Sequence, residues 1–392
     1  MIHTIIKTIQ IVSTIGALAG AGYYVVSLWS AWAYLRAIEA RIQEHSMLAG
    51  GLPPVSILKP LKGVDPQIYE CFRSHCDQDY PADYEIIFGV SEADDPAVAI
   101  VRRLQLEFPQ RRIELVVCSE RLGVNVKVSN LAQMVRSARY DCLLVNDSDI
   151  HVGPGYLRHV VTPLKDPGVG MVTCLYRGNA APTLGSCLEA LGISTDFVPG
   201  VLVARSLEGG LHFGLGSTLV FRRGELQALG GFESLLDYLA DDYELGKRIS
   251  DLGRRVELSE TVVETFLPPY KLAQFFQHQL RWARAIRDSR PGGYIGLLFT
   301  FGLPWALLAA LTNYREIWPW DLLAVVVLLR VAVAVVVGAK VLGDRQVLSW
   351  LFMLPVRDVI AVVVWIASFG GNTINWRGDA FTLKNGRLIQ RS

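Results

Sequence analysis

An apolar run that ends in two acidic residues lies near the middle of the chain. It reads Cys142-Leu143-Leu144-Val145-Asn146-Asp147-Ser148-Asp149. Four apolar residues before a polar turn are typical of a short buried strand. Carboxylates two residues apart at a strand end can share one task, because one can reach the ribose of a nucleotide while the other holds a divalent cation on the diphosphate. A solvated turn is the alternative, since this acidic pattern also occurs by chance.

Strand-like and helix-like patterns alternate on both sides of this run, from about residue 53 to residue 268. Strands are expected at 55–58, 84–90, 113–118, 142–145, 170–175 and 217–221, and helices at 96–107 and 128–138. Such alternation predicts an α/β domain in which helices cover a mostly parallel sheet. Ligands of these sheets bind beyond the carboxyl ends of the strands. Functional residues are therefore sought at the strand ends.

Two further acidic clusters begin helices. Asp94 and Asp95 follow the strand at 84–90, where a carboxylate could accept hydrogen bonds from a uracil or a ribose. Capping of the helix by Asp95, before Pro96, is the alternative. Asp242 begins another helix and is the candidate for the base that deprotonates an acceptor hydroxyl. An acidic first turn favoured by the helix dipole explains it as well.

A basic amphipathic run at 270–287 contains His278-Gln279-Leu280-Arg281-Trp282. Arg281 could pair with a diphosphate, since a guanidinium offers two parallel donors, and Trp282 could form a wall of the acceptor site. The alternative is a helix at the membrane surface that places Trp282, Arg284 and Arg287 among lipid headgroups. Both can hold, because such a helix would bring a lipid acceptor to the donor.

Two lysines and a glycine-containing loop leave similar alternatives open. Lys59 and Lys127 could approach the nucleotide, or they could solvate the ends of a strand and a helix. The loop at 212–217 contains two glycines, which would let the backbone come close to an acceptor. A tight turn without a ligand accounts for that loop nearly as well.

Both ends of the chain are apolar. The 392 residues are 51% hydrophobic and 19% charged, which is less charge than a soluble enzyme usually carries. The run at 5–35 is long enough to span a bilayer, and Arg36 and Arg41 follow it, so the positive-inside rule places the downstream domain in the cytoplasm. Three more spans are expected at 294–311, 322–342 and 347–369.

Two features qualify this membrane topology. Arg330 and Arg357 lie inside the last two expected spans, where ionisable residues usually face protein or water. The basic tail at 371–392 favours the cytoplasm, whereas three C-terminal spans after one N-terminal span would place it outside. One C-terminal segment is therefore expected not to cross.

The net charge argues against a nucleic-acid-binding protein, and the cysteine spacing argues against a site built on a C-x-x-C pair. The net charge of +1 lacks the basic footprint of a nucleic-acid-binding protein. None of the six cysteines forms a C-x-x-C pair, and they are expected to be free thiols in a reducing cytoplasm.

Several of these segments together resemble a known family. They are 55–66, which contains Leu-Lys-Pro-Leu-Lys-Gly, 79–81, 94–97, 125–130, 147–148, 241–243 and 281–282. In order and spacing they resemble the family-2-type inverting glycosyltransferases with the GT-A fold. Within that group they are similar to the ceramide glucosyltransferase-like family and its bacterial hopanoid-biosynthesis relatives. The resemblance covers residues 53–287 and the flanking membrane layout.

The resemblance implies a D…D…D…(Q/R)xxRW catalytic set. Carried over, it assigns Asp95 and Asp147 to the first two acidic positions and Asp242 to the third, as the base. Arg281 and Trp282 belong to the last motif. The chain departs from the pattern at His278, where the family has Gln or Arg, which puts the donor or acceptor preference in doubt. Asp149 adds a carboxylate that some relatives lack.

The resulting hypothesis is an inverting glycosyltransferase of a bacterial inner membrane with a cytoplasmic catalytic domain. Its expected parts are an N-terminal anchor at 1–40, a GT-A domain at 53–268, an amphipathic segment at 269–293, a membrane region at 294–370 and a basic tail at 371–392. A UDP-hexose or UDP-N-acetylhexosamine is the expected donor, and a membrane lipid hydroxyl, of a hopanoid polyol or of ceramide, is the expected acceptor.

Each expected site residue has a role in this hypothesis. Asp242 is the base, and Asp147 and Asp149 hold Mg²⁺ or Mn²⁺. The nucleotide-sugar is contacted by Asp94, Asp95, Lys127, Asp147, His278, Arg281 and Trp282. A processive polysaccharide synthase and a non-catalytic nucleotide-sugar-binding membrane protein are the alternatives.

Overall fold

The computed structural model describes residues 1–47, 51–376 and 379–390. The chain divides into two compact units. Unit 1 contains residues 1–37, 182–206 and 269–385, and unit 2 contains residues 38–181, 207–268 and 386–392. The sequence placed 182–206 inside the catalytic domain, whereas the structure groups this segment with the helices at both ends of the chain.

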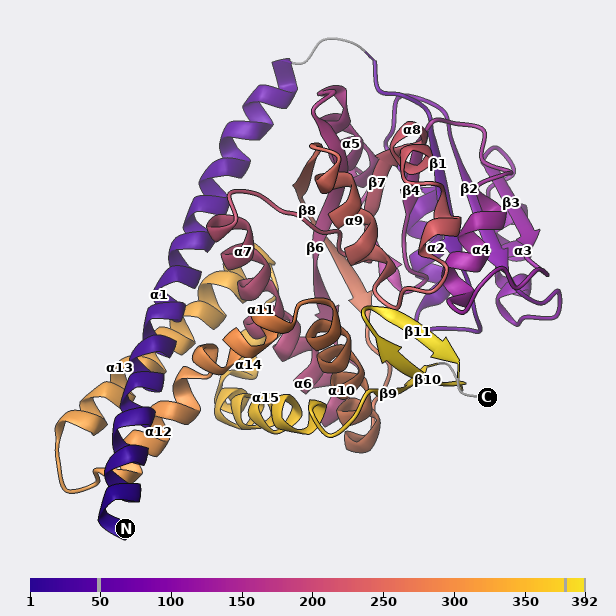
Figure 1. Cartoon of the computed structure of the whole chain (residues 1–392). Coiled ribbons are helices and arrows are strands. Elements are labelled where there is room, and N and C mark those ends of the chain that lie inside the picture. The colour runs from indigo at the N-terminus through magenta and orange to yellow at the C-terminus, as the bar shows by residue number, and fades with distance from the viewer. Residues whose placement is uncertain (48–50, 377–378, 391–392) are drawn as a thin grey trace. The chain divides into compact units, whose positions relative to one another are not determined.

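Unit 2 is built on an eight-stranded sheet with the strand order β3-β2-β1-β4-β7-β6-β8-β5 (Figure 1). The strands are β1 (Val55–Pro60), β2 (Tyr84–Val90), β3 (Arg112–Val117), β4 (Cys142–Val145), β5 (Ile150–His151), β6 (Val169–Asn179), β7 (Leu219–Arg222) and β8 (Arg255–Phe266). Strands β3, β2, β1 and β4 run parallel, β7 is antiparallel to both β4 and β6, and β8 is parallel to β6. The mostly parallel sheet predicted from the sequence is thus present, with β7 reversed at its centre and β5 reversed at its edge.

Helices cover this sheet. They are α2 (Ile68–Cys76), α3 (Ala97–Glu107), α4 (Val126–Met134), α5 (Tyr156–Val161), α8 (Arg223–Ala228) and α9 (Asp241–Asp251). Every residue of β1, β2 and β4 is buried, as expected for parallel strands covered on both faces. Phe72 of α2 packs on Phe88 of β2 with their ring centroids 4.6 Å apart. This packing holds the carboxyl ends of β1, β2 and β4 at one edge of the sheet.

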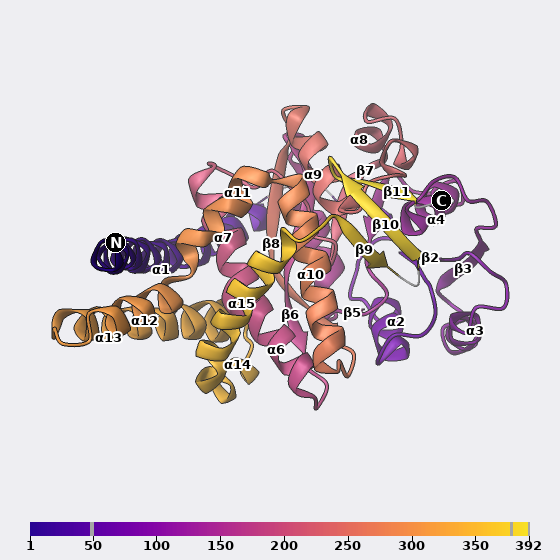
Figure 2. The same cartoon turned by 60° about the horizontal axis from the view of Figure 1, so that its bottom comes forward.

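Unit 1 is mainly helical. Its elements are α1 (Ile2–Met47, shared at its end with unit 2), α6 (Leu184–Gly192), α7 (Val198–Leu207), α10 (Leu272–Ser289), α11 (Pro291–Gly296), α12 (Gly302–Thr312), α13 (Trp318–Val333), α14 (Gln346–Ser349), α15 (Leu354–Ser368), β9 (Thr373–Trp376) and β10 (Asp379–Lys384). A π-helical segment at Ile193–Phe197 joins α6 to α7, and another at Ala334–Val341 extends α13. Figure 2 shows α10 lying alongside α15. Strand β11 (Arg387–Gln390) belongs to unit 2.

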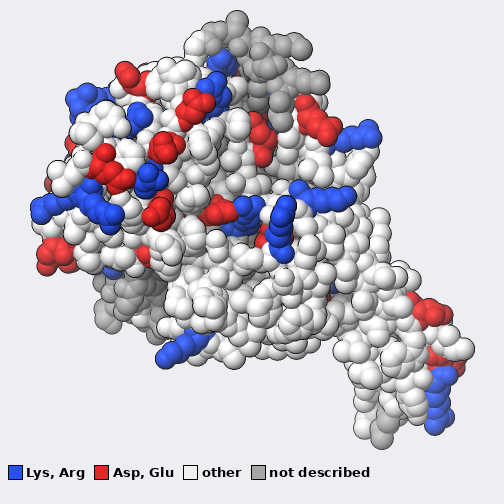
Figure 3. Space-filling view, turned by 180° about the vertical axis from the view of Figure 1, so that it is seen from behind, with Lys and Arg blue, Asp and Glu red and all other residues white. Residues whose placement is uncertain are grey.

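Four helices of the described residues are long and apolar enough to cross a membrane: His3–Arg41, Leu184–Leu207, Trp318–Val341 and Leu351–Ser368. The sequence predicted three of them and missed Leu184–Leu207, which carries charged residues and lies between two strands of unit 2 in chain order. The part of unit 1 that carries α12 and α13 is white along its length in Figure 3, with charged side chains at its far end. Such a surface suits lipid tails, so the chain is a membrane protein.

The span expected at 294–311 is broken. Residues Pro291–Thr300 and Gly302–Thr312 form two helical pieces bent by 47°. The break falls at Phe301, which lies outside helical geometry with φ −77° and ψ 53°. Pro304 explains the position, because its ring lacks an N–H and collides with the carbonyl of Thr300, four residues earlier. A bend of this kind occurs both in broken spans and in re-entrant segments, so the expectation that one C-terminal segment does not cross stays a prediction.

Two glycines let α1 and α12 meet backbone to backbone. A Cβ atom on Gly20 would lie 2.1 Å from the Cα atom of Gly302. Small residues at such crossings are typical of helix pairs in membranes, where close backbone packing replaces the hydrophobic effect.

Gly20→Val is expected to force α1 and α12 apart and to lower the free energy of unfolding by about 1–3 kcal/mol. Gly22→Val is the matched control, because a Cβ on Gly22 meets no atom within 4 Å. Unfolding in detergent micelles, followed by circular dichroism, compares the two. Equal stability of both variants would contradict the close crossing.

Candidate active site

A lysine and two aspartates form an ion-paired centre in unit 2. Asp147 follows β4, and its Oδ1 lies 2.9 Å from Nζ of Lys127 in the first turn of α4. The same Nζ lies 3.2 Å from Oδ2 of Asp241, the first residue of α9. Asn125 caps α4 by accepting a hydrogen bond from the Val128 amide, which fixes the helix end that carries Lys127. Lys127 therefore contacts the acidic motif at the end of β4, and its contact with the nucleotide stays a prediction.

The ammonium of Lys127 is kept charged by these neighbours. Burial alone would lower the pKa of Lys127, but the carboxylates of Asp147, Asp241 and Asp242 raise it above its usual range. Burial raises the pKa of Asp241, and the Lys127 cation partly offsets that rise. Asp241 was not among the residues expected from the sequence. Its adjacency to Asp242 at a helix start was the one available signal.

Asp242 lies close to Asp147 across a glycine. A Cβ atom on Gly216 would lie 3.0 Å from Oδ2 of Asp242 and 3.2 Å from Oδ2 of Asp147. Burial, and next the charge of Asp241, raises the pKa of Asp242 to about 6. A carboxyl group with that pKa can accept a proton near neutral pH. Oδ1 of Asp242 also accepts a hydrogen bond of 2.8 Å from the Tyr243 amide in the first turn of α9, so a role in the acidic first turn and a catalytic role are compatible here.

Asp149 has a different partner from Asp147. Its Oδ2 accepts a hydrogen bond of 2.6 Å from Oγ1 of Thr265 on β8. Burial, and next the charge of Asp147, raises the pKa of Asp149 to about 6. Within the described ranges no group of three or more His, Cys, Asp or Glu side chains could hold a metal ion. The carboxylates of Asp147 and Asp149 nevertheless suit a hard cation, because Mg²⁺ takes one or two carboxylates and completes its shell with phosphate oxygens and water.

Two fully buried polar side chains, Lys59 and Asn146, support the acidic turn. Lys59, at 0% exposure near the end of β1, donates a 3.1 Å hydrogen bond to the backbone carbonyl of Asp147. Burial lowers the pKa of Lys59 to about 8. Asn146, also at 0% exposure, donates to Oη of Tyr156 and to the Ser217 carbonyl. The idea that Lys59 is a solvated strand end is therefore wrong, since its ammonium is inside the protein and holds the backbone of the motif.

The cluster expected at 94–95 lies at the edge of a loop. Oδ2 and Oδ1 of Asp95 accept hydrogen bonds from the Gly63 amide at 2.9 and 3.2 Å, and Oδ1 accepts one from the Ala97 amide. Gly63 has a φ of 72°, a left-handed conformation that favours glycine. Asp95 thus caps α3 and holds the loop of the Leu-Lys-Pro-Leu-Lys-Gly segment, while Asp94 is exposed. Nucleotide contacts by either residue stay a prediction.

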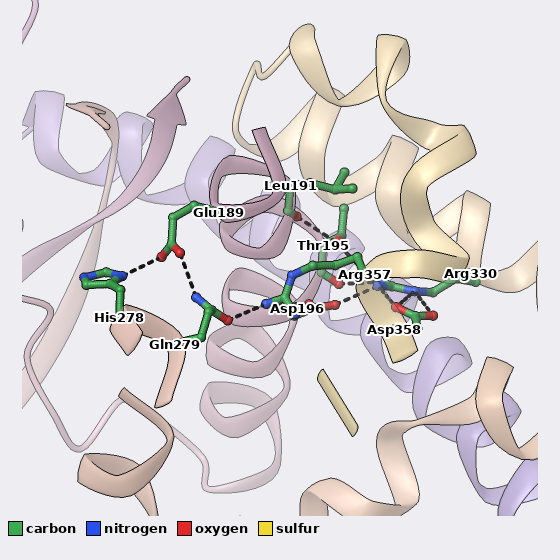
Figure 4. A network of polar contacts seen from close by, with 9 residues as sticks. All are labelled: Glu189, Leu191, Thr195, Asp196, His278, Gln279, Arg330, Arg357 and Asp358. Atoms are coloured by element: carbon green, nitrogen blue, oxygen red, sulfur yellow. Dashed lines mark hydrogen bonds and ion pairs between the residues drawn. The ribbon is translucent and has the colours of Figure 1, made fainter. Parts of the chain in front are cut away.

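The aromatic-basic motif lies on α10 in unit 1. His278 packs between the rings of Tyr270 and Trp282, at centroid distances of 5.4 and 5.2 Å. Nδ1 of His278 lies 3.2 Å from Oε1 of Glu189 on α6 (Figure 4). The ring of Trp282 also contacts Phe197 of the π-helical segment at 5.9 Å.

Two arginines of α10 have roles inside unit 1. Arg287 donates to the Ser368 carbonyl at the end of α15, and Arg284 donates to the Thr373 carbonyl of β9. Cations at a helix C-terminus satisfy its last carbonyls. These hydrogen bonds fix Arg284 and Arg287 within unit 1, and contact of the two side chains with lipid headgroups stays a prediction.

Known proteins share this chain's sequence pattern and fold. Residues 12–389 match the family described as "Glycosyl transferase family 21". Ceramide glucosyltransferase 1 of Caenorhabditis elegans is 24% identical over 363 residues, which cover 87% of this chain and 74% of that protein. The ceramide glucosyltransferase of Komagataella phaffii is 32% identical over 36% of this chain and 29% of that protein.

One solved structure shares the fold over most of the chain. A mannosyltransferase from Pyrobaculum calidifontis, solved in complex with GDP-Man and Mn²⁺, is 21% identical and has a TM-score of 0.50. The match covers 90% of this chain and 98% of that chain. The predicted GT-A glycosyltransferase fold is thus confirmed.

If Asp242 accepts the proton, kcat/KM will rise with pH through about 6 and level off above, because only the ionised carboxylate is a base. The Lys127 cation lowers the pKa of Asp242. Lys127→Met is therefore expected to move the rise in kcat/KM to higher pH. Rate profiles of both proteins from about pH 5 to about pH 8 make the comparison. A rise that stays in place, or moves to lower pH, would argue against Asp242.

Gly216→Ala is expected to push the Asp242 and Asp147 carboxylates away from their positions, since its Cβ would lie within 3.2 Å of both. Misplaced groups of this kind reduce kcat by about tenfold or more. Gly224→Ala is the matched control, because a Cβ there meets no atom within 4 Å. Steady-state rates and unfolding midpoints of both variants are the measurements. An unchanged kcat in Gly216→Ala would show that the two carboxylates need not lie this close.

Proposed function

The chain belongs to glycosyl transferase family 21, and we propose that this glycosyltransferase moves a hexose or N-acetylhexosamine from a UDP-sugar to a primary hydroxyl of a membrane lipid, with inversion at the anomeric carbon. The observation that carries the proposal is the pairing of Lys127 with Asp147 and Asp241 beside Asp242. Cationic and acidic groups at one strand end suit a sugar donor whose leaving group is a diphosphate.

Asp242 is the proposed base. It takes the proton of the lipid hydroxyl while that oxygen forms a bond to the anomeric carbon, and the bond from this carbon to the diphosphate oxygen breaks. The leaving diphosphate takes the electron pair of that bond. A single displacement of this kind inverts the configuration. A pKa of about 6 leaves most of the Asp242 carboxyl ionised at neutral pH, as this role requires.

Asp147 and Asp149 would hold a divalent cation, and the cation would stabilise the charge on the leaving diphosphate. The mannosyltransferase of similar fold was solved with Mn²⁺, which supports Mn²⁺ or Mg²⁺ for this chain. Lys127 adds a fixed positive charge at Asp147. Asp94, Asp95, His278, Arg281 and Trp282 stay proposed contacts of the nucleotide-sugar.

The acceptor is proposed to be an alcohol of the lipid bilayer. Relatives in Caenorhabditis elegans and Komagataella phaffii are named ceramide glucosyltransferases, which supports a ceramide-like acceptor. A polyhydroxylated hopanoid offers the same chemistry, and a bacterial inner membrane with the active site on the cytoplasmic face is the proposed location. The proposed parts are those given above, with residues 182–206 moved from the catalytic domain to the membrane-associated unit.

Purified protein incubated with a panel of UDP-sugars and lipid alcohols is expected to release UDP and to form one glycolipid carrying a single sugar, identified by mass. Asp242→Asn should reduce the rate by about 10²–10⁴-fold, because a positioned base contributes that much. Asp251→Asn is the matched control on the same helix, where Asp251 pairs at the surface with Lys247.

Three outcomes would contradict the proposal. Equal UDP release by the parent and Asp242→Asn would remove the assigned base. A polymeric product would favour a polysaccharide synthase, and binding of UDP-sugar without any product would favour a non-catalytic protein. Retained anomeric configuration in the product, measured by NMR, would exclude the single displacement.

A further inference from the structure

One buried carboxylate in unit 1 accepts a hydrogen bond from one residue of α10 and lies close to the ring of its neighbour. Glu189 lies on α6 with 1% exposure. Its Oε1 lies 3.2 Å from Nδ1 of His278, and its Oε2 accepts a 2.8 Å hydrogen bond from Nε2 of Gln279 (Figure 4). Both contacts point from α10 toward the same side chain, so Glu189 opposes rotation of α10 about its axis.

The amide of Gln279 is held in one orientation. Its Nε2 donates to Glu189, and its Oε1 accepts a 2.9 Å hydrogen bond from Nη2 of Arg357 on α15. A flipped amide would place its NH₂ against the guanidinium and its oxygen against the carboxylate. Gly192 of α6 makes room for Arg357, since a Cβ there would lie 2.4 Å from Nη2 of Arg357.

The network continues into the other membrane helices. Nη2 of Arg357 lies 3.2 Å from Oδ2 of Asp196, and Oδ1 of Asp196 lies 2.7 Å from Nη2 of Arg330 on α13. Arg330 also donates to Asp358 of α15 at 3.0 Å and to the Thr195 carbonyl at 2.7 Å. Because Thr195 and Asp196 belong to the π-helical segment, that irregular turn is what supplies both acceptors. The position of α10 is therefore tied to α6, α13 and α15 by buried charges that are costly to separate.

We propose that Glu189 is a positioning residue for the transfer reaction: by holding His278 and Gln279 it sets the directions of Arg281 and Trp282. Residues three and four apart share one face of a helix, so His278 lies on the same face as Arg281 and Trp282. The ring of His278 contacts the ring of Trp282, so fixing His278 also limits the orientation of Trp282 on α10. This inference rests on the proposed function, which assigns Arg281 and Trp282 to the nucleotide-sugar.

Glu189→Gln tests the inference with little change in volume. The new amide presents an NH₂ to His278 or Gln279 in place of a carboxylate oxygen. kcat is expected to fall by about 10- to 100-fold, with a smaller change in KM for the UDP-sugar. The double variant Glu189→Gln with Gln279→Glu exchanges the two groups, keeps an amide-to-carboxylate hydrogen bond between positions 189 and 279, places a carboxylate beside Arg357, and is expected to recover most of kcat.

Asp344→Asn is the matched control. Asp344 is a carboxylate of unit 1 with 3% exposure that accepts a 2.7 Å hydrogen bond from Ser194. Asp344→Asn removes a buried charge, as Glu189→Gln does, and it is expected to change kcat by less than about threefold. A loss in Asp344→Asn as large as in Glu189→Gln, an unchanged kcat in Glu189→Gln, or no recovery in the exchange variant would overturn the inference.

A second measurement separates this inference from the proposed function. Backbone hydrogen exchange of the α10 residues, followed by mass spectrometry on the full chain in detergent, is expected to speed up in Glu189→Gln and not in Asp344→Asn. The exchange variant should return to the parent rate. If the parent protein transfers no sugar to any lipid, the proposed function fails. If hydrogen exchange of the α10 residues is the same in Glu189→Gln as in the parent, the inference that Glu189 positions α10 is overturned.

Discussion

The ion pairs of Lys127 with Asp147 and Asp241 are the interaction on which the proposed chemistry depends. Asp147, Asp241 and Asp242 gather in a partly buried space, where their like charges repel one another. One ammonium among them offsets part of that repulsion. The ammonium of Lys127 pairs directly with Asp147 and Asp241, while burial, and next the charge of Asp241, keeps the pKa of Asp242 raised, as suits a base. The sheet serves this arrangement by holding the end of β4 beside the first turns of α4 and α9.

Much of unit 2 could be read from the sequence. The strands at 84–90 and 142–145 were predicted with the bounds that the structure has, because apolar residues fill them and polar turns follow. The long strand β8 was missed, since charged residues interrupt its apolar pattern. The pairing of Asp241 with Lys127 was missed as well, because about 110 residues separate them and only the tertiary fold places them together.

The helical unit was harder to predict for a different physical reason. Leu184–Leu207 carries Glu189, Asp196 and Arg205 and is still apolar enough to cross a membrane, but it follows a strand of unit 2 in chain order, and the sequence alone assigned it to the catalytic domain. The apolar run at 294–311 was predicted to be one span, and its composition could not reveal the break before Pro304. Sequence patterns report local preference, whereas these features depend on partners distant in the chain.

The buried segment Leu184–Leu207 has a consequence for how the protein is made. Ribosomes deliver Asp196 well before Arg330 and Arg357, whose side chains complete its ion pairs, and they deliver Glu189 well before His278 and Gln279. During that interval the unpaired carboxylates are costly to place in lipid. This helix is therefore expected to stay in water, at the membrane surface or inside the insertion machinery until the C-terminal helices emerge. Assembly of the helical unit is thus expected to be a late, concerted step of biogenesis.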